Sequence, residues 1–299
     1  MKKIISIIAP CYNESDNIQP FYQRLAKIFK EELSNYDYEI IVVDDNSTDS
    51  SSEILKKISA NDDNFKLIFN ARNYGVHVST FNAIKYIKGD ALIPMLPVDM
   101  QDTPEIIIDF VKKWEEGFDI VYGIKKDREE NFFLKFSRNI YYNLVTKISN
   151  VNIPPYVGEF QLLDKKIYQE LLNFDDYYPY TRGIIATLSS NSFGIEYTWK
   201  KRLKGKSKTS ILKLFDMAIN GIISFGAGFL AEMNDNNIFL LSALLSNIWA
   251  GVGTWNSSTN YQLQKIKAKQ PYGWAYGAKI VIVLNFLTMA GQAILLFNM

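Results

Sequence analysis

The sequence predicts an α/β fold in which helices flank a mostly parallel β-sheet. Apolar, β-branched runs such as IISIIAP (4–10) and YEIIVVDD (38–45) alternate with segments whose apolar residues recur at helical spacing, such as 18–33. This alternation is typical of a parallel sheet covered by helices on both faces. A further observation is that charged residues are missing from two long stretches near the C-terminus, which predicts membrane helices after the α/β domain.

The predicted elements continue in the same alternating order. Further strands are predicted at 65–70, 91–96 and 119–124, and helices at 49–59, 76–88 and 104–116. Sheets of this type bind their ligands at the carboxyl ends of the strands. The candidate site therefore consists of the polar residues that follow the strands: Tyr12–Glu14, Asp44–Asn46, Arg72–Asn73 and Asp99–Asp102.

Composition and missing motifs exclude several classes of protein. The chain has 33 basic and 32 acidic residues, so we expect no nucleic-acid partner, which would favour a strongly basic face. Neither GxGxxG nor GxxxxGKS is present, which argues against a dinucleotide-binding fold or a P-loop. The one cysteine, Cys11, excludes an internal disulfide and fits a cytoplasmic domain.

The two uncharged stretches, 236–264 and 280–299, predict a transmembrane hairpin over 236–299. Each is long enough to cross a hydrocarbon core of about 30 Å at about 1.5 Å per residue. The alternative is a pair of buried helices in a soluble domain, because Asn247 and Gln292 dilute the apolar character.

Residues 210–235 form the predicted juxtamembrane segment. Ile211, Phe215 and Ile222 fall on one helical face, which indicates an amphipathic helix at the membrane interface. The basic residues in 200–213 outnumber those of the hairpin loop, so the positive-inside rule favours a multi-pass membrane protein whose N-terminal domain is cytoplasmic.

Seven segments carry a resemblance to a known family. They occur in the order APCYNESDNI, EIIVVDDNSTDSS, NARNYGVHVSTFNAI, PVDMQDTPE, YVGEFQLLDKKIY, TRGIIA and KRLKGKSKTSILKLFDMAINGIISF. Together they resemble the inverting family-2 glycosyltransferases, and among these the polyprenyl-phosphate glycosyltransferases similar to dolichyl-phosphate mannose synthase. The resemblance implies a GT-A-type fold for 1–209, a nucleoside diphosphate sugar donor, transfer with inversion, and a polyprenyl phosphate or other lipid-linked acceptor at the bilayer. It leaves a homo-oligomer possible.

The resemblance also implies the donor site. The residues expected to contact the donor are Pro10, Tyr12, Asn13, Glu14, Asp44, Asp45, Arg72, Asp99, Gln101, Arg202, Ser207 and Lys208. A tyrosine can stack on a base, carboxylates accept hydrogen bonds from base or ribose, and cations offset charge on the leaving diphosphate. Alternatives are a helix cap at Ser15 and a basic cluster that faces anionic lipid.

The family's metal motif is altered in this chain. Where the family has Asp-x-Asp followed two residues later by Gln, this chain has Pro97, Asp99 and Gln101. Mg²⁺ needs only one or two protein carboxylates when phosphates complete its coordination, so we expect Mg²⁺ or Mn²⁺ at Asp99 and Gln101. The alternative is that the loop only caps the next helix through Asp102 or Thr103.

The acceptor side departs from the family as well. Glu159 and Gln161 stand where the family has Asp and Arg. We expect Asp99 and Glu159 to be catalytic, with Glu159 as general base if the acceptor is a sugar hydroxyl, because a lipid phosphate needs little base. His77 is expected on a helix face near the donor, without a catalytic role.

The candidate acceptor-binding residues are Lys135, Ser137 and Arg138, in a basic segment that could bind a phosphate, although a solvated charge run explains that segment equally well. The departures at Pro97, Glu159 and Gln161 leave two other functions open. One is transfer to a glycan or glycolipid hydroxyl, and the other is a catalytically degenerate, membrane-bound member of the family.

Overall fold

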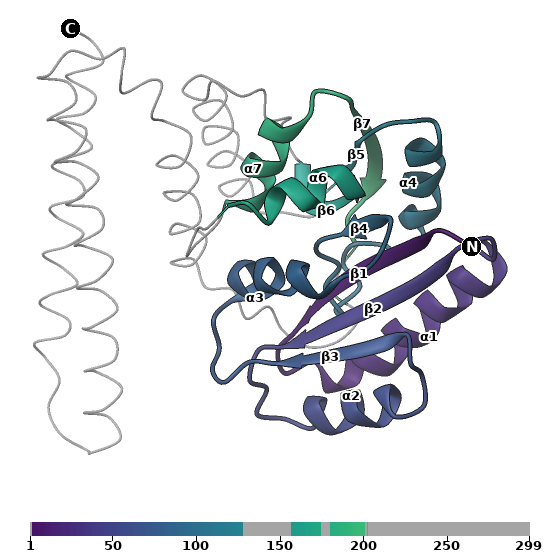
Figure 1. Ribbon diagram of the computed structural model, residues 1–299. Helices are drawn as coiled ribbons and strands as arrows, with labels where there is room; N and C mark the ends of the chain where they lie inside the picture. The colour runs from purple at the N-terminus through teal and green to yellow at the C-terminus, as the bar shows by residue number, and fades with distance from the viewer. Residues whose placement is uncertain (1, 128–156, 175–179, 201, 203–299) are drawn as a thin grey trace, which may run out of the picture. The chain divides into compact units, whose positions relative to one another are not determined.

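The computed structural model describes residues 2–127, 157–174, 180–200 and 202 (Figure 1). The chain divides into two units, Met1–Gly226 and Ala227–Met299, and all described residues belong to the first. The predicted juxtamembrane segment and hairpin therefore lie outside the described residues. Among the residues that are described, no helix is long and apolar enough to cross a membrane.

Seven strands of the described residues form one mixed sheet, in the order β3-β2-β1-β4-β6-β5-β7. Their bounds are β1 Ile4–Cys11, β2 Asp37–Asp44, β3 Phe65–Phe69, β4 Ala91–Ile93, β5 Ile120–Asp127, β6 Val157–Asp164 and β7 Ser192–Thr198. β6 runs antiparallel to both of its neighbours, and the other pairs are parallel. The predicted, mostly parallel α/β sheet is confirmed.

The helices sort onto the two faces of the sheet. Their bounds are α1 Ser15–Glu31, α2 Ser51–Ser59, α3 Val76–Ala83 with the 3₁₀ turn η1 Ile84–Tyr86, α4 Ile106–Glu115, α6 Lys165–Leu171 and α7 Thr181–Leu188. Buried side chains of α1, α2 and α4 pack in one core, and those of α3, α6 and α7 pack in a second core across the sheet (Figure 1). The layered arrangement follows from strands that are apolar on both sides.

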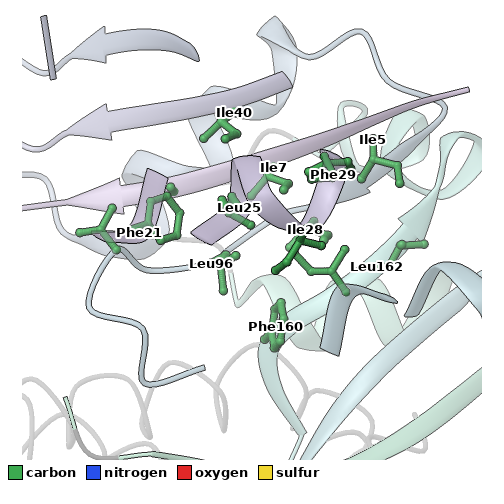
Figure 2. Close-up of a cluster of buried hydrophobic side chains, with 14 of the residues drawn as sticks. Ile5, Ile7, Phe21, Leu25, Ile28, Phe29, Ile40, Leu96, Phe160 and Leu162 are labelled. Carbon is green, nitrogen blue, oxygen red and sulfur yellow. The ribbon is translucent and has the colours of Figure 1, made fainter. Parts of the chain in front are cut away.

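Figure 2 shows how the first core joins distant parts of the chain. Phe21 and Leu25 of α1, Ile7 of β1 and Phe160 of β6 all belong to this core, and all four are fully or almost fully buried. Burial of such a side chain stabilises the fold by about 1.5–3 kcal/mol. Because strand residues alternate between faces, Phe160 in this core places Glu159 on the opposite face, toward α3 and α7.

The chain turns sharply after three parallel strands, at the same edge of the sheet. Asn13 follows β1, Asn46 follows β2 and Met100 lies in the loop after β4, and their φ angles are 54°, 63° and 55°. Asparagine tolerates this left-handed conformation, but methionine does so at a cost, typically on the order of 1 kcal/mol or more. The buried Met100 thus marks a strained loop beside Asp99.

Candidate active site

An arginine joins the ends of two strands at the carboxyl edge of the sheet. Arg202 Nη1 lies 2.5 Å from Glu14 Oε1, and Arg202 Nη2 lies 2.9 Å from Asp99 Oδ2. The side chains of Glu14 and Asp99 are each only 10% exposed. One guanidinium therefore bridges two buried carboxylates and offsets half of their charge, and three of the expected donor contacts come together.

Burial governs the ionisation of Asp99. It raises the pKa of the Asp99 carboxyl above its ordinary value, while a backbone hydrogen bond from Gln101 and the charge of Arg202 act in the opposite direction. The Gln101 N–H lies 3.1 Å from Asp99 Oδ1. The Gln101 carbonyl in turn accepts from the Lys200 N–H at 3.0 Å, which ties the loop to the chain after β7. The loop thus holds Asp99 at Oδ1, and Arg202 holds it at Oδ2.

Asp45 stabilises the turn that leads into α3. Its carboxylate accepts from the N–H groups of Tyr74 (2.9 Å) and Gly75 (2.8 Å), from Asn70 Nδ2 (2.8 Å) and from Ser79 Oγ (2.9 Å). These bonds fix the turn that begins α3, where Gly75 has a φ of 90° and a side chain would be strained. Asp45 thus has four protein partners in addition to any contact with a base.

Asp44 and Asn13 organise the loop after β2. Asp44 Oδ1 accepts from the Ser47 N–H at 3.1 Å, and its Oδ2 accepts from the Ser52 hydroxyl. Asn13 Oδ1 accepts from the Thr48 N–H at 2.7 Å. These polar groups hold the ends of β1 and β2 in a fixed relation, as a preorganised binding edge requires.

The remaining predicted donor residues are spread around this edge. Pro10 is buried within β1, where it pairs with Val43, and Tyr12 is partly buried just beyond the strand. Arg72 is exposed, with its guanidinium carbon 4.6 Å from the centroid of the Tyr74 ring. The structure does not bring Arg72 into the Glu14–Arg202–Asp99 bridge. The predicted residues Ser207, Lys208, Lys135, Ser137 and Arg138 lie outside the described residues.

The prediction that Asp102 or Thr103 caps the next helix is wrong. α4 begins at Ile106 with Glu105 in the capping position. The Asp102 carboxylate instead lies 2.9 Å from Lys125 Nζ and accepts from the Tyr197 hydroxyl. Sequence reasoning missed this buried cluster, because its members come from three separate segments and no local pattern links them.

A second missed feature is a histidine–carboxylate pair on the α3/α7 face. His77 Nδ1, on α3, lies 4.0 Å from Glu159 Oε1, on β6, and the two side chains are 13% and 14% exposed. His77 Nε2 and Glu159 Oε2 are buried without a hydrogen-bond partner among the described residues. Burial lowers the pKa of His77; the charge of Glu159 opposes this and that of Arg182 adds to it. His77 lies on a helix, as expected.

The donor set at Asp99 suits a metal only in combination with phosphate. Within the described residues no group of three or more His, Cys, Asp or Glu could hold a metal ion. Pro97 offers no ligand atom, and Asp99 Oδ2 is engaged by Arg202. Asp99 and Gln101 supply at most a carboxylate and an amide oxygen, which suffices for Mg²⁺ or Mn²⁺ when a diphosphate and water complete the coordination.

The domain has a GT-A-like α/β fold, with carboxylates at the carboxyl edge of its sheet, and this is the fold of a class of glycosyltransferases. The model of glycosyl transferase family 2 matches residues 6–172, and the chain belongs to this family. An uncharacterised glycosyltransferase of Bacillus subtilis is 33% identical over 221 residues, which are 74% of this chain and 68% of the relative. A prophage bactoprenol glucosyl transferase homolog of Escherichia coli is 31% identical over 74% of this chain and 72% of its own length.

Solved structures agree on the fold. A mannosyltransferase of Pyrobaculum calidifontis, in complex with GDP-mannose and Mn²⁺, has a TM-score of 0.51 and 12% identity over 99% of this chain and 81% of its own. Glucosyl-3-phosphoglycerate synthase of Mycobacterium tuberculosis has a TM-score of 0.52 and 16% identity over 74% of this chain and 80% of its own. At these identities the likeness concerns the fold alone.

Proposed function

We propose that this glycosyltransferase moves a sugar from a nucleoside diphosphate sugar to polyprenyl phosphate, with inversion at the sugar carbon. The acceptor is inferred from relatives such as the bactoprenol glucosyl transferase of Shigella phage SfX, which is 29% identical over 84% of this chain and 82% of its own length. The same names favour glucose as the first sugar to test.

The ion pairs of Arg202 with Glu14 and Asp99 are the observation that supports donor binding at this site. A guanidinium that pairs with two carboxylates in the empty protein is placed to pair with a diphosphate when the donor enters. Tyr12, Asn13, Asp44 and Asp45 then line the nucleoside side, and the proposed contacts of Ser207 and Lys208 extend the cationic side. Positive charge at the diphosphate stabilises the leaving group as the sugar carbon–oxygen bond breaks.

Asp99 and Gln101 would hold a divalent metal together with the donor's diphosphate. The metal would neutralise charge on the leaving nucleoside diphosphate. Because the chain offers few ligands of its own, metal affinity should be low without nucleotide and much higher with it. Asp99 acts in this scheme by orienting the diphosphate, while Glu159 belongs to the acceptor side.

The membrane arrangement is part of the proposal. Residues 1–209 would form the cytoplasmic catalytic domain, 210–235 an interfacial helix and 236–299 a transmembrane hairpin. Lys135, Ser137 and Arg138 would meet the acceptor's phosphate where it leaves the bilayer. The sequence supports this arrangement through its two uncharged stretches.

The test is transfer of radiolabelled glucose from UDP-glucose by membranes that contain the full-length chain, with added polyprenyl phosphate. We expect label in the organic phase, dependent on polyprenyl phosphate and absent when unphosphorylated polyprenol replaces it. Asp99→Asn is the matched control: it retains the shape of the site, loses the carboxylate charge, and should transfer far less label. Label that appears only in a water-soluble glycan, or in no product with any nucleotide sugar, would refute the proposed function.

A further inference from the structure

The pair of His77 and Glu159 is built from two distant segments. β6 runs antiparallel to β4, with Leu163 opposite Leu92, so Glu159 lies beyond the carboxyl end of β4, at the edge from which Asp99 also projects. α3 brings His77 to the same place, because Asp45 fixes the turn at its start. The pair therefore lies at the ligand-binding edge of the sheet, but on the face opposite α1 and α4.

Two atoms of this pair lack partners. His77 Nε2 and Glu159 Oε2 are both buried and form no hydrogen bond with any described residue. A buried polar atom without a partner destabilises a fold, so such atoms in a native protein point to a ligand that binds there. The imidazole nitrogen Nε2 is thus available to a ligand, while Nδ1 faces the Glu159 carboxylate.

The acceptor site also needs a cation. A phosphate monoester carries a charge of about −1.5 to −2 at pH 7, and Gln161, two residues after Glu159 on β6, is neutral. Glu159 would repel such an acceptor, whereas Arg182, whose charge also reaches His77, would attract it. An imidazolium between the carboxylate and the phosphate removes this conflict, because both of its nitrogens donate hydrogen bonds.

We propose that His77 is a ligand of the acceptor's phosphate and that Glu159 is its positioning residue. In the complex, His77 Nδ1–H donates to Glu159 Oε1, and Nε2–H donates to a phosphate oxygen. His77 is neutral before the acceptor binds, and it takes up one proton when the acceptor binds. This inference rests on the proposed function, because it assumes a phosphate acceptor, and it gives Glu159 a role other than general base.

The charged groups around His77 fit this role. Glu159 faces Nδ1 and favours the imidazolium, whereas burial and the nearby charge of Arg182 on α7 favour the neutral ring. Arg182 is itself held by the Tyr180 hydroxyl at 2.7 Å. Asp45, at the start of α3, is already saturated by four hydrogen bonds. Entry of an anion tips this balance toward protonated His77.

The test is the KM for polyprenyl phosphate between pH 6.5 and 8.5, measured with the full-length chain and saturating donor. In this range the phosphate, with a second pKa of about 6, is mainly the dianion, so a pH effect on KM reports the protein. We expect the wild-type KM to rise with pH, by about tenfold per pH unit where proton uptake limits binding. His77→Gln should raise KM about 10- to 100-fold at pH 6.5 and make it nearly independent of pH.

Three further measurements separate a ligand from a structural residue. Glu159→Gln should shift the rise in KM to lower pH, since the imidazolium loses its carboxylate. The KM for the donor should stay unchanged in both variants, and thermal unfolding should show that both are folded. Asn82→Ala, an exposed change on the same helix, should leave both KM values unaltered.

The outcomes distinguish this inference from the function on which it rests. If the wild-type protein transfers sugar to polyprenyl phosphate and His77→Gln keeps the wild-type KM at every pH, His77 is not an acceptor ligand, and the proposed function stands. A change confined to the KM of the donor would overturn the inference as well. If the wild-type protein yields no lipid-linked sugar, the proposed function itself fails.

Discussion

Replacing Arg202 by glutamine should destabilise the catalytic domain more than an ordinary surface substitution does. The change leaves Glu14 and Asp99, each with a side chain 10% exposed, without their shared cation. Removal of one partner from a buried ion pair typically costs about 3–5 kcal/mol. Because Arg202 is itself 17% exposed, we expect the lower end, about 3 kcal/mol. At about 2–4 °C per kcal/mol for a domain of this size, Tm should fall by roughly 6–12 °C.

The loss of Tm in Arg202→Gln should depend on pH, and this dependence distinguishes it from an ordinary loss of packing. Without Arg202 the folded state disfavours the ionised carboxylates, so the destabilisation is full at neutral pH and shrinks as acid protonates them. The measurement is thermal unfolding of the full-length chain in detergent, followed by tryptophan fluorescence, at pH 7.5 and at pH 5. Combining Arg202→Gln with Asp99→Asn should recover part of the loss, because one of the two stranded charges is removed.

A surface pair supplies the matched control. Arg24 pairs with Glu105, but these side chains are 38% and 42% exposed. Solvent screening limits such pairs to about 0–1 kcal/mol, so Arg24→Gln should lower Tm by no more than about 4 °C. If Arg202→Gln changed Tm as little as Arg24→Gln does, and equally at both pH values, the argument that the Glu14–Arg202–Asp99 bridge stabilises the domain would be refuted.

Two further substitutions test the carboxylates at the sheet edge. Asp99→Asn should lower transfer about a hundredfold. It should also raise Tm at pH 7.5, because burial raises the pKa of Asp99 and its ionised form destabilises the fold. This gain should shrink as the pH falls through the folded-state pKa and vanish only below about pH 3, where the acid is protonated in the unfolded chain as well. A Tm equal to wild type at all pH values would contradict the reasoning. Asp45→Asn should cost about 2 kcal/mol, since the turn before α3 loses a charged acceptor. Urea unfolding measures the loss, and an unchanged midpoint would show that the turn does not depend on Asp45.

The sequence predicted β1 to β5, because these strands contain apolar runs with clear ends, but it predicted neither β6 nor β7, in which polar residues and glycine interrupt the apolar pattern. β1 and β2 fall within about a residue of the predicted segments, and β4 is shorter than predicted, ending at Ile93. The antiparallel direction of β6 could not be predicted either, since the sequence of a strand carries no sign of the direction of its neighbours. Its reversal has a functional result, because it brings Glu159 to the same edge as Asp99.

The sequence predicted the candidate site only in part, for a related reason. Residues that follow strands were identified correctly as a group, because parallel strands end at one edge. Their individual partners depend on contacts between distant segments. The local sequence around Asp102 is typical of a helix cap, but its carboxylate instead contacts Lys125 and Tyr197, which lie far away in the sequence. A lone histidine likewise gives no hint of its partner until β6 is placed beside α3.

The Arg202 bridge also affects how the protein is made. Glu14 and Arg202 are 188 positions apart in the chain. At a synthesis rate of about 5–20 residues per second, Glu14 emerges from the ribosome roughly 10–40 s before its partner. During that interval the β1–β4 portion carries Glu14 and Asp99 without their shared cation, so a chain that stops short of Arg202 keeps more negative charge at the sheet edge than the complete domain does.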